Sequence, residues 1–228
     1  MEMKTLQTPF SIIAAAVLLA STLTVATGCS NTSKTTKGAG IGAGAGAIIG
    51  GIIGSRSDNT AKGAIVGAAV GGTAGAIIGA QMDKQAKELE EELEGAEVAR
   101  VGEGIQIVFD NAILFEFDSA EIKPEARTNL SRLAESLREY PNTDVMIVGH
   151  TDATGPEDYN LKLSERRADA ARASLLNAGV PSGRVLMEGR GEIEPIASNE
   201  TAEGRRLNRR VEVAIYASEE YREQLEKG

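Results

Sequence analysis

The hydrophobic and polar residues of this chain change pattern several times between its two ends. An apolar run at residues 11–20 is followed by two uncharged glycine-rich blocks, 38–54 and 63–79. Residues 81–100 are rich in Glu and Lys, and from residue 102 onward short apolar runs alternate with longer stretches of helical spacing. We therefore predict an N-terminal apolar segment, a glycine-rich segment, a charged spacer and a folded C-terminal domain.

The C-terminal region has the pattern of a small domain of strands and helices. Its short apolar runs predict four strands, at residues 105–109, 145–148, 185–188 and 211–216. Helical spacing predicts one helix that begins at Pro124 and a second over residues 157–177, which Gly179 and Pro181 end. This alternation predicts an α+β domain over residues 102–218, with helices packed on one face of a mixed four-stranded sheet, and a charged tail over 219–228.

Residues 1–28 have the layout of a secretory signal peptide, with a short apolar core and small residues before Cys29. Cys29 is the one cysteine of the chain, so it has no partner for an internal disulfide. The segment Ala26-Thr27-Gly28-Cys29 resembles a bacterial lipobox, which implies that Cys29 is acylated on sulfur and anchors the protein through its lipid. The alternative is an ordinary signal peptide followed by a free cysteine. Residues 29–37 are predicted to form a polar tether.

Of the 26 glycines, 14 lie between Gly38 and Gly79. In both blocks they recur four residues apart, as in Gly63, Gly67 and Gly71. Small residues at this spacing line one face of a helix and let membrane helices approach closely. We predict a membrane-associated glycine-zipper helical hairpin over residues 38–80, capable of self-association; a flexible Gly/Ala-rich tether is the alternative.

The spacer at residues 81–101 contains strong helix formers but few large apolar residues. A helix of this composition has no wide face to bury. We therefore predict a solvated helical stalk that holds the C-terminal domain away from a membrane.

Composition excludes several classes of function. The net charge of −9 argues against a nucleic-acid partner, whose binders present basic surfaces. One cysteine and one histidine supply too few ligands for a Cys/His zinc site, and no Gly-Lys-Ser/Thr phosphate loop is present. We expect no metal, no cofactor and no enzymatic activity, and a structural hydrogen bond for His150.

Four ordered motifs carry a family resemblance. They are FEFDSAEIKP from Phe115, VGHTDATG from Val148, YNLKLSERRA from Tyr159 and NRRVEV from Asn208. Together they resemble the OmpA-like domain, and with the lipobox and glycine segment the chain resembles envelope lipoproteins of the YiaD type.

The resemblance implies a pocket for the diaminopimelate of peptidoglycan stem peptides. Asp152 matches the residue that takes the ligand ammonium, and Arg167 the one that pairs with its carboxylate. Asn160 and Arg209 match further polar contacts, and Asp118 would close the other side of the pocket. Without the resemblance, Asp152 would be a turn residue and its pair with Arg167 a surface salt bridge. Arg166, Arg205, Arg206 and Arg210 are expected to be surface charges.

We therefore predict an outer-membrane lipoprotein whose periplasmic domain binds peptidoglycan noncovalently and tethers the membrane to the cell wall. The alternative is an oligomeric envelope-assembly or channel-forming protein that acts through the glycine hairpin, with the C-terminal domain only positioning it on the wall.

Overall fold

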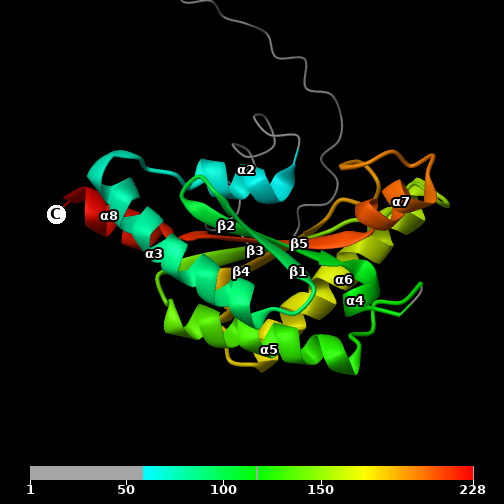
Figure 1. The fold of residues 1–228 in the computed structure, drawn as a ribbon, viewed down its shortest axis with the longest axis horizontal. Helices are drawn as coiled ribbons and strands as arrows, with labels where there is room; N and C mark the ends of the chain where they lie inside the picture. Colours follow the sequence, from blue (N-terminus) through cyan, green and yellow to red (C-terminus); the bar gives the residue numbers. More distant parts are fainter. Residues whose placement is uncertain (1–58, 117, 228) are drawn as a thin grey trace, which may run out of the picture. The chain divides into compact units, whose positions relative to one another are not determined.

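The computed structural model describes residues 59–116 and 118–227 of the chain. In this part a mixed five-stranded sheet lies between helices (Figure 1). Its strands are β1 (Ala96–Val101), β2 (Gly104–Asp110), β3 (Thr143–Gly149), β4 (Val185–Gly189) and β5 (Arg210–Ala217). The strand order is β1-β2-β5-β3-β4, and β3 and β4 are the parallel pair while the other neighbours are antiparallel.

The helices are α2 (Thr60–Gly67), α3 (Gly72–Glu92), the short α4 (Asn111–Leu114), α5 (Pro124–Glu139), α6 (Glu157–Asn177), α7 (Ala202–Asn208) and α8 (Glu219–Lys227), with one 3-10 turn, η1 (Ser182–Arg184). The predicted α+β class is confirmed, with five strands in place of four. The charged tail forms α8.

The larger core lies on the sheet face that α3, α5 and α6 cover. Strand residues alternate between the two faces, so Ile105, Ile107 and Phe109 of β2 all point into this core. Leu130 and Leu133 of α5 are buried against the same cluster. The buried faces of the helices and the inward-facing residues of the strands therefore pack together in one apolar layer.

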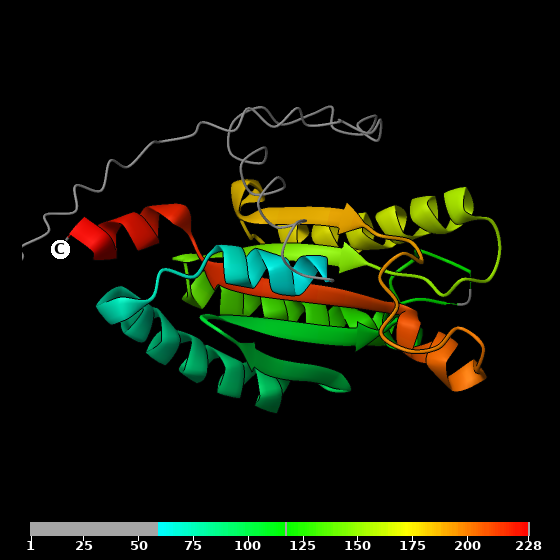
Figure 2. The same ribbon diagram turned by 90° about the horizontal axis from the view of Figure 1, so that it is seen from above.

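The other face of the sheet is covered by α2, which lies across it on the side opposite α5 and α6 (Figures 1 and 2). A second buried cluster forms there from Ala61, Ala64 and Ile65 of α2, its C-cap residue Ala68, and Met146, Val148, Ala214 and Tyr216 of the sheet. Helices were predicted on one face only, and the structure corrects this. Alanines let the short helix lie close to the strands, so the second face is closed by small residues.

The start of α2 is fixed to the sheet by polar contacts. The Asn59 side-chain amide donates to both carboxylate oxygens of Glu212 at 2.8 and 2.9 Å. Glu212 also accepts from Arg210 on the same strand at 2.6 Å, and both of these side chains are fully buried. The Thr60 hydroxyl donates to Glu194 at 2.5 Å. From Asn59 onward the chain is therefore part of the folded domain.

Glycines of the second block have roles inside this domain. Gly71 and Gly72 have φ of +70° and +63° and form the turn between α2 and α3. The Glu103 carboxylate accepts hydrogen bonds from the backbone N–H groups of Val70 and Gly71, each at 2.8 Å. A Cβ at Gly75 would lie 2.2 Å from Oε1 of Glu103, so a larger residue there would displace the Glu103 carboxylate from its position. In residues 59–80 the glycine pattern builds a turn and a close contact in place of the predicted hairpin arm.

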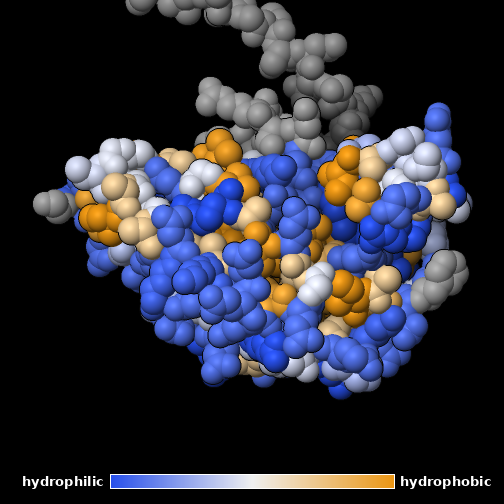
Figure 3. All heavy atoms as spheres, in the orientation of Figure 1, coloured by the Kyte–Doolittle hydropathy of each residue, from blue (hydrophilic) through white to orange (hydrophobic). Residues whose placement is uncertain are grey.

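The charged spacer also differs from the prediction. Helix α3 runs through its first half and buries Ile78, Met82 and Leu89, one stripe that crosses the boundary at residue 80. Residues 96–101 form the edge strand β1, which pairs with β2. The outer side of α3 is charged, and Figure 3 shows a mainly hydrophilic surface with apolar side chains in separate patches. The segment is a packed part of the domain and is not a solvated stalk.

The signal peptide, Cys29, the polar tether and the first glycine block lie outside the described residues. Among the helices that the structure does describe, none combines the length and apolar character needed to span a membrane.

Candidate functional site

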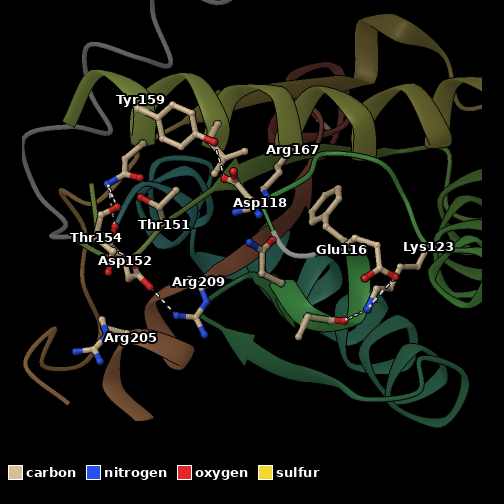
Figure 4. A pocket seen from close by; sticks show the side chains of 15 residues that line it. Glu116, Asp118, Lys123, Thr151, Asp152, Thr154, Tyr159, Arg167, Arg205 and Arg209 are labelled. Atoms are coloured by element: carbon tan, nitrogen blue, oxygen red, sulfur yellow. Dashed lines mark hydrogen bonds and ion pairs between the residues drawn. The ribbon is translucent and has the colours of Figure 1, made fainter. Parts of the chain in front are cut away.

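A pocket of about 620 Å³ opens at the end of the sheet where β3 ends and β5 begins (Figure 4). It is lined by Asn111, Ala112, Phe115, Glu116, Asp118, Lys123, Thr151, Asp152, Thr154, Tyr159, Asn160, Leu163, Arg167, Arg205 and Arg209. All five residues predicted to bind ligand are among them. The pocket is concave and carries both charged and apolar groups, which suits a small polar ligand.

Asp152 lies on the loop after β3, next to the start of β5. Its Oδ2 accepts a hydrogen bond from Nη1 of Arg209 at 2.6 Å, and its Oδ1 accepts from the Thr154 backbone N–H at 2.9 Å. Burial raises the pKa of this carboxyl, but the hydrogen bonds from Arg209 and Thr154 outweigh burial and leave the pKa below its usual value. Asp152 is therefore an ionised carboxylate at neutral pH.

Asn160 holds the Asp152 loop in place from the first turn of α6. Its side-chain amide donates to the backbone carbonyls of Asp152 and Thr154, each at 3.2 Å, and to Glu192 at 2.6 Å. Its amide hydrogens are thus engaged, and the role visible in the structure is to position Asp152.

Arg167 lies two turns further along α6, on the same face as Asn160, and is 4% exposed. Its Nε donates to the Ser119 backbone carbonyl at 2.8 Å, and its guanidinium lies 5.5 Å from the centroid of the Phe115 ring. Burial lowers the pKa of Arg167 while the nearby Asp118 charge raises it; the group remains cationic. Neither Nη group has a hydrogen-bond partner among residues 59–116 and 118–227.

Asp118 lines the pocket on the side away from Asp152. It has φ of +54° and lies on the loop between α4 and α5. Its carboxylate accepts a hydrogen bond from the hydroxyl of Tyr159 on α6, and Figure 4 shows this pair beside Arg167. Asp118 therefore lies beside the buried guanidinium of Arg167, and the Asp152 carboxylate lines the same pocket next to Arg209.

The four arginines that were expected to be surface charges fall into three groups. Arg166 and Arg206 are exposed, as expected. Arg210 is a correction, because it is buried and paired with Glu212. Arg205 is a second correction, because it lines the pocket. It precedes Arg209 by four residues, and this helical spacing was the signal that could have found it.

His150 lies outside the pocket, buried on the sheet face that α2 covers. Within the described part of the chain, neither ring nitrogen has a hydrogen-bond partner, so the predicted structural hydrogen bond is not observed. Burial and the charges of Arg210 and Arg190 lower its pKa to about 2. His150 is therefore a neutral core residue.

Comparison with known proteins agrees with the fold. Residues 114–209 match the sequence model of the OmpA family, and residues 3–83 match that of the YMGG-like Gly-zipper family. The first match contains all five predicted site residues, and the second ends inside α3.

Two relatives illustrate the similarity. The probable lipoprotein YiaD of Escherichia coli is 42% identical over 53% of this chain and 55% of its own length, so the chain spans about half of that relative. The outer-membrane lipoprotein YfiB of Pseudomonas aeruginosa is 36% identical over 50% of this chain and 68% of its own length.

A solved structure extends the comparison. The cell wall anchor of the type VI secretion system (T6SS) of Pseudomonas aeruginosa has a TM-score of 0.53 and 30% identity, covering 60% of this chain and 97% of that one. The predicted outer-membrane location is supported by relatives named as outer-membrane proteins, among them outer membrane protein A of Bordetella avium and YfiB. With these motifs, this fold and this pocket, the chain belongs to the OmpA family.

Proposed function

We propose that the pocket binds the diaminopimelyl residue of peptidoglycan stem peptides noncovalently, and that this contact tethers the outer membrane to the cell wall. The observation that carries the proposal is the buried guanidinium of Arg167. Its Nη edge lines a pocket without a protein acceptor in the described residues, and the side chains of Asp118 and Asp152 line the same pocket.

The free edge of Arg167 fits a ligand carboxylate. The two Nη groups of an arginine form a planar fork that donates two parallel hydrogen bonds to a carboxylate. Burying a cation without an acceptor is unfavourable, so a ligand that supplies one recovers part of this cost. The Ser119 carbonyl and the Phe115 ring hold the guanidinium in position before the ligand arrives.

The carboxylates of the pocket fit the ligand ammonium. Asp152 is ionised and keeps unused lone pairs, since each carboxylate oxygen can accept more than one hydrogen bond. Asp118 supplies a second negative charge on the other side. An ammonium and a carboxylate on one carbon atom, as in the free end of diaminopimelate, would meet both kinds of group together.

A solved relative described as a cell wall anchor, at 30% identity, supports a role at the wall. The predicted lipid on Cys29 would supply the membrane end of the tether. Because many copies would face one polymer, weak individual sites could still hold the two layers together through avidity. The alternative function depends on the glycine segment, of which residues 59–79 are packed against the domain and residues 38–58 lie outside the described part.

Sedimentation of the full chain with purified diaminopimelate-type peptidoglycan tests the proposal. The variant Arg167→Lys keeps the charge and the stem of the side chain but loses the planar fork. We expect binding to fall by about tenfold or more, since a hydrogen-bonded charge pair contributes about 1.5–3 kcal/mol. Arg166→Lys, at the exposed neighbouring position, is the matched control and should bind like the wild type.

A second variant tests the opposite charge. Asp152→Asn removes the negative charge that would meet the ammonium, and we expect a loss of similar size. Thermal unfolding of each variant separates lost binding from lost folding. If both variants fold and sediment with the wall as well as the wild type does, the proposed site is refuted.

A further inference from the structure

Three arginines line the pocket, and among the described residues each is held through one edge of its guanidinium. Arg167 donates through Nε to the Ser119 carbonyl, which leaves the Nη1/Nη2 edge. Arg205 donates through Nη1 to the carbonyls of Asn199 and Glu200, at 2.8 and 3.1 Å. Arg209 donates through Nη1 to Asp152. Arg205 and Arg209 therefore keep the Nε/Nη2 edge, the second two-donor edge of a guanidinium.

The charges of the pocket are only partly paired. Lys123 lies 3.6 Å from Glu116, and Arg209 lies 2.6 Å from Asp152. Within the described ranges, Arg167 and Arg205 have no carboxylate partner within ion-pair distance. The two guanidiniums without an acid partner fit two ligand carboxylates. The pocket carboxylates, which keep unused lone pairs, fit one ligand ammonium.

The end of α7 positions Arg205 to bind a ligand carboxylate. The backbone carbonyls of Asn199 and Glu200 fix its guanidinium without neutralising it, because they are uncharged acceptors. In Figure 4, Arg205 lies beyond the Asp152–Arg209 pair as seen from Arg167. A carboxylate at Arg205 would therefore be a different group from the carboxylate at Arg167.

We infer that Arg205 forms a second carboxylate subsite of the pocket. This inference rests on the proposed function and deepens it, because it names which form of the stem peptide is preferred. The ligand would be an end of the stem that carries a free ammonium and a second free carboxylate. A stem whose amine is consumed in a peptide cross-link has lost that positive charge and fits the pocket less well.

Two amino acids serve as probes of the subsite. Free meso-diaminopimelate carries two carboxylates, and lysine is the same carbon chain without one of them. Isothermal titration of the full chain in detergent with meso-diaminopimelate and with D- and L-lysine gives the contribution of the second carboxylate directly. For the wild type we expect diaminopimelate to bind about tenfold more tightly than lysine, the range for one hydrogen-bonded charge pair.

The variants Arg205→Gln and Arg206→Gln distinguish binding at the subsite from the effect of removing one positive charge nearby. Arg206 is the neighbouring exposed arginine, which pairs with Asp110 and Glu203. We expect Arg205→Gln to weaken diaminopimelate binding to the level of lysine and to leave lysine binding unchanged. Arg206→Gln should change neither.

The outcomes separate the inference from the proposed function. If Arg205→Gln leaves diaminopimelate affinity unchanged, or weakens both probes equally, Arg205 is no carboxylate subsite and the inference fails alone. The second result would also reveal a shift of the Asn199 loop, which contacts the Ala153 backbone N–H at 3.2 Å. If the wild type binds neither probe, the proposed function fails and the inference with it.

Discussion

The packing of α2 against the sheet predicts that one side chain of the glycine-rich segment stabilises the whole domain. Ile65 is fully buried, and its Cγ atoms lie within 3.0 Å of where a Cβ on Gly104 would stand. Ile65→Ala removes three buried carbon atoms at about 0.8 kcal/mol each, and the cavity left behind adds to the loss. We expect the free energy of unfolding to fall by about 3 kcal/mol, with Tm lower by about 6–12 °C.

Val66 is the matched control, because it is the next residue of the same helix and is 57% exposed. Urea unfolding of the full chain, followed by far-UV circular dichroism, should give Val66→Ala a midpoint close to the wild type. A glycine segment that acted as a separate membrane hairpin or a passive linker would make the two substitutions equal. Equal midpoints for Ile65→Ala and Val66→Ala would therefore refute the docking of α2.

Two further predictions concern the anchor and the pH dependence of stability. Cys29→Ser should move the protein from the membrane fraction to the soluble periplasmic fraction, with Ser33→Ala as control; retention in the membrane would contradict a lipid anchor. Burial raises the pKa of Asp144 to about 6, so its contribution to stability is present at low pH and is lost as the pH rises through about 6. Asp144→Asn should raise the free energy of unfolding by about 2 kcal/mol at pH 7.5 and hardly change it at pH 4, and an equal gain at both pH values would show that burial of the charge is not the cause.

Much of the sheet and its main helices could be predicted from the sequence. The strands at 105–109 and 211–216 are short apolar runs because their residues are largely buried, and the helix at 157–177 is ended by Gly179 and Pro181. The edge strand β1 has no such pattern, since its residues are half-buried and include Glu97 and Arg100. An edge strand is defined by its partner, which composition alone does not show.

The packing of the glycine segment is harder to predict from the sequence. Small residues four apart look the same whether a helix packs on another helix in lipid or on a sheet in a soluble domain. Ala61, Ala64, Ile65 and Ala68 follow the spacing of a single buried face, a signal present in the sequence. The role of Gly75 could not be predicted, because Glu103, which needs the space, is distant in the sequence.

In the site, too, some residue pairs are brought together by their spacing in one helix, and others only by the fold. Asn160 and Arg167 share a face of α6 through their spacing of seven residues, which the sequence gives directly. The pairing of Asp152 with Arg209 joins two loops that are 57 residues apart. The hydrogen bonds that Nε or Nη1 donates determine which edge of each arginine guanidinium stays available for a ligand. For Arg167 and Arg205 the acceptors are backbone carbonyls, which a sequence motif cannot identify.

The docking of Asn59 has a mechanical consequence. With Cys29 acylated, tension between membrane and wall would enter the fold at Asn59 and pass to Glu212 on the central strand β5. That strand begins at Arg210, directly after Arg209 in the pocket. One short path of force from membrane to wall would therefore pass through the first residues of a single strand, with the contact between Thr60 and Glu194 beside it.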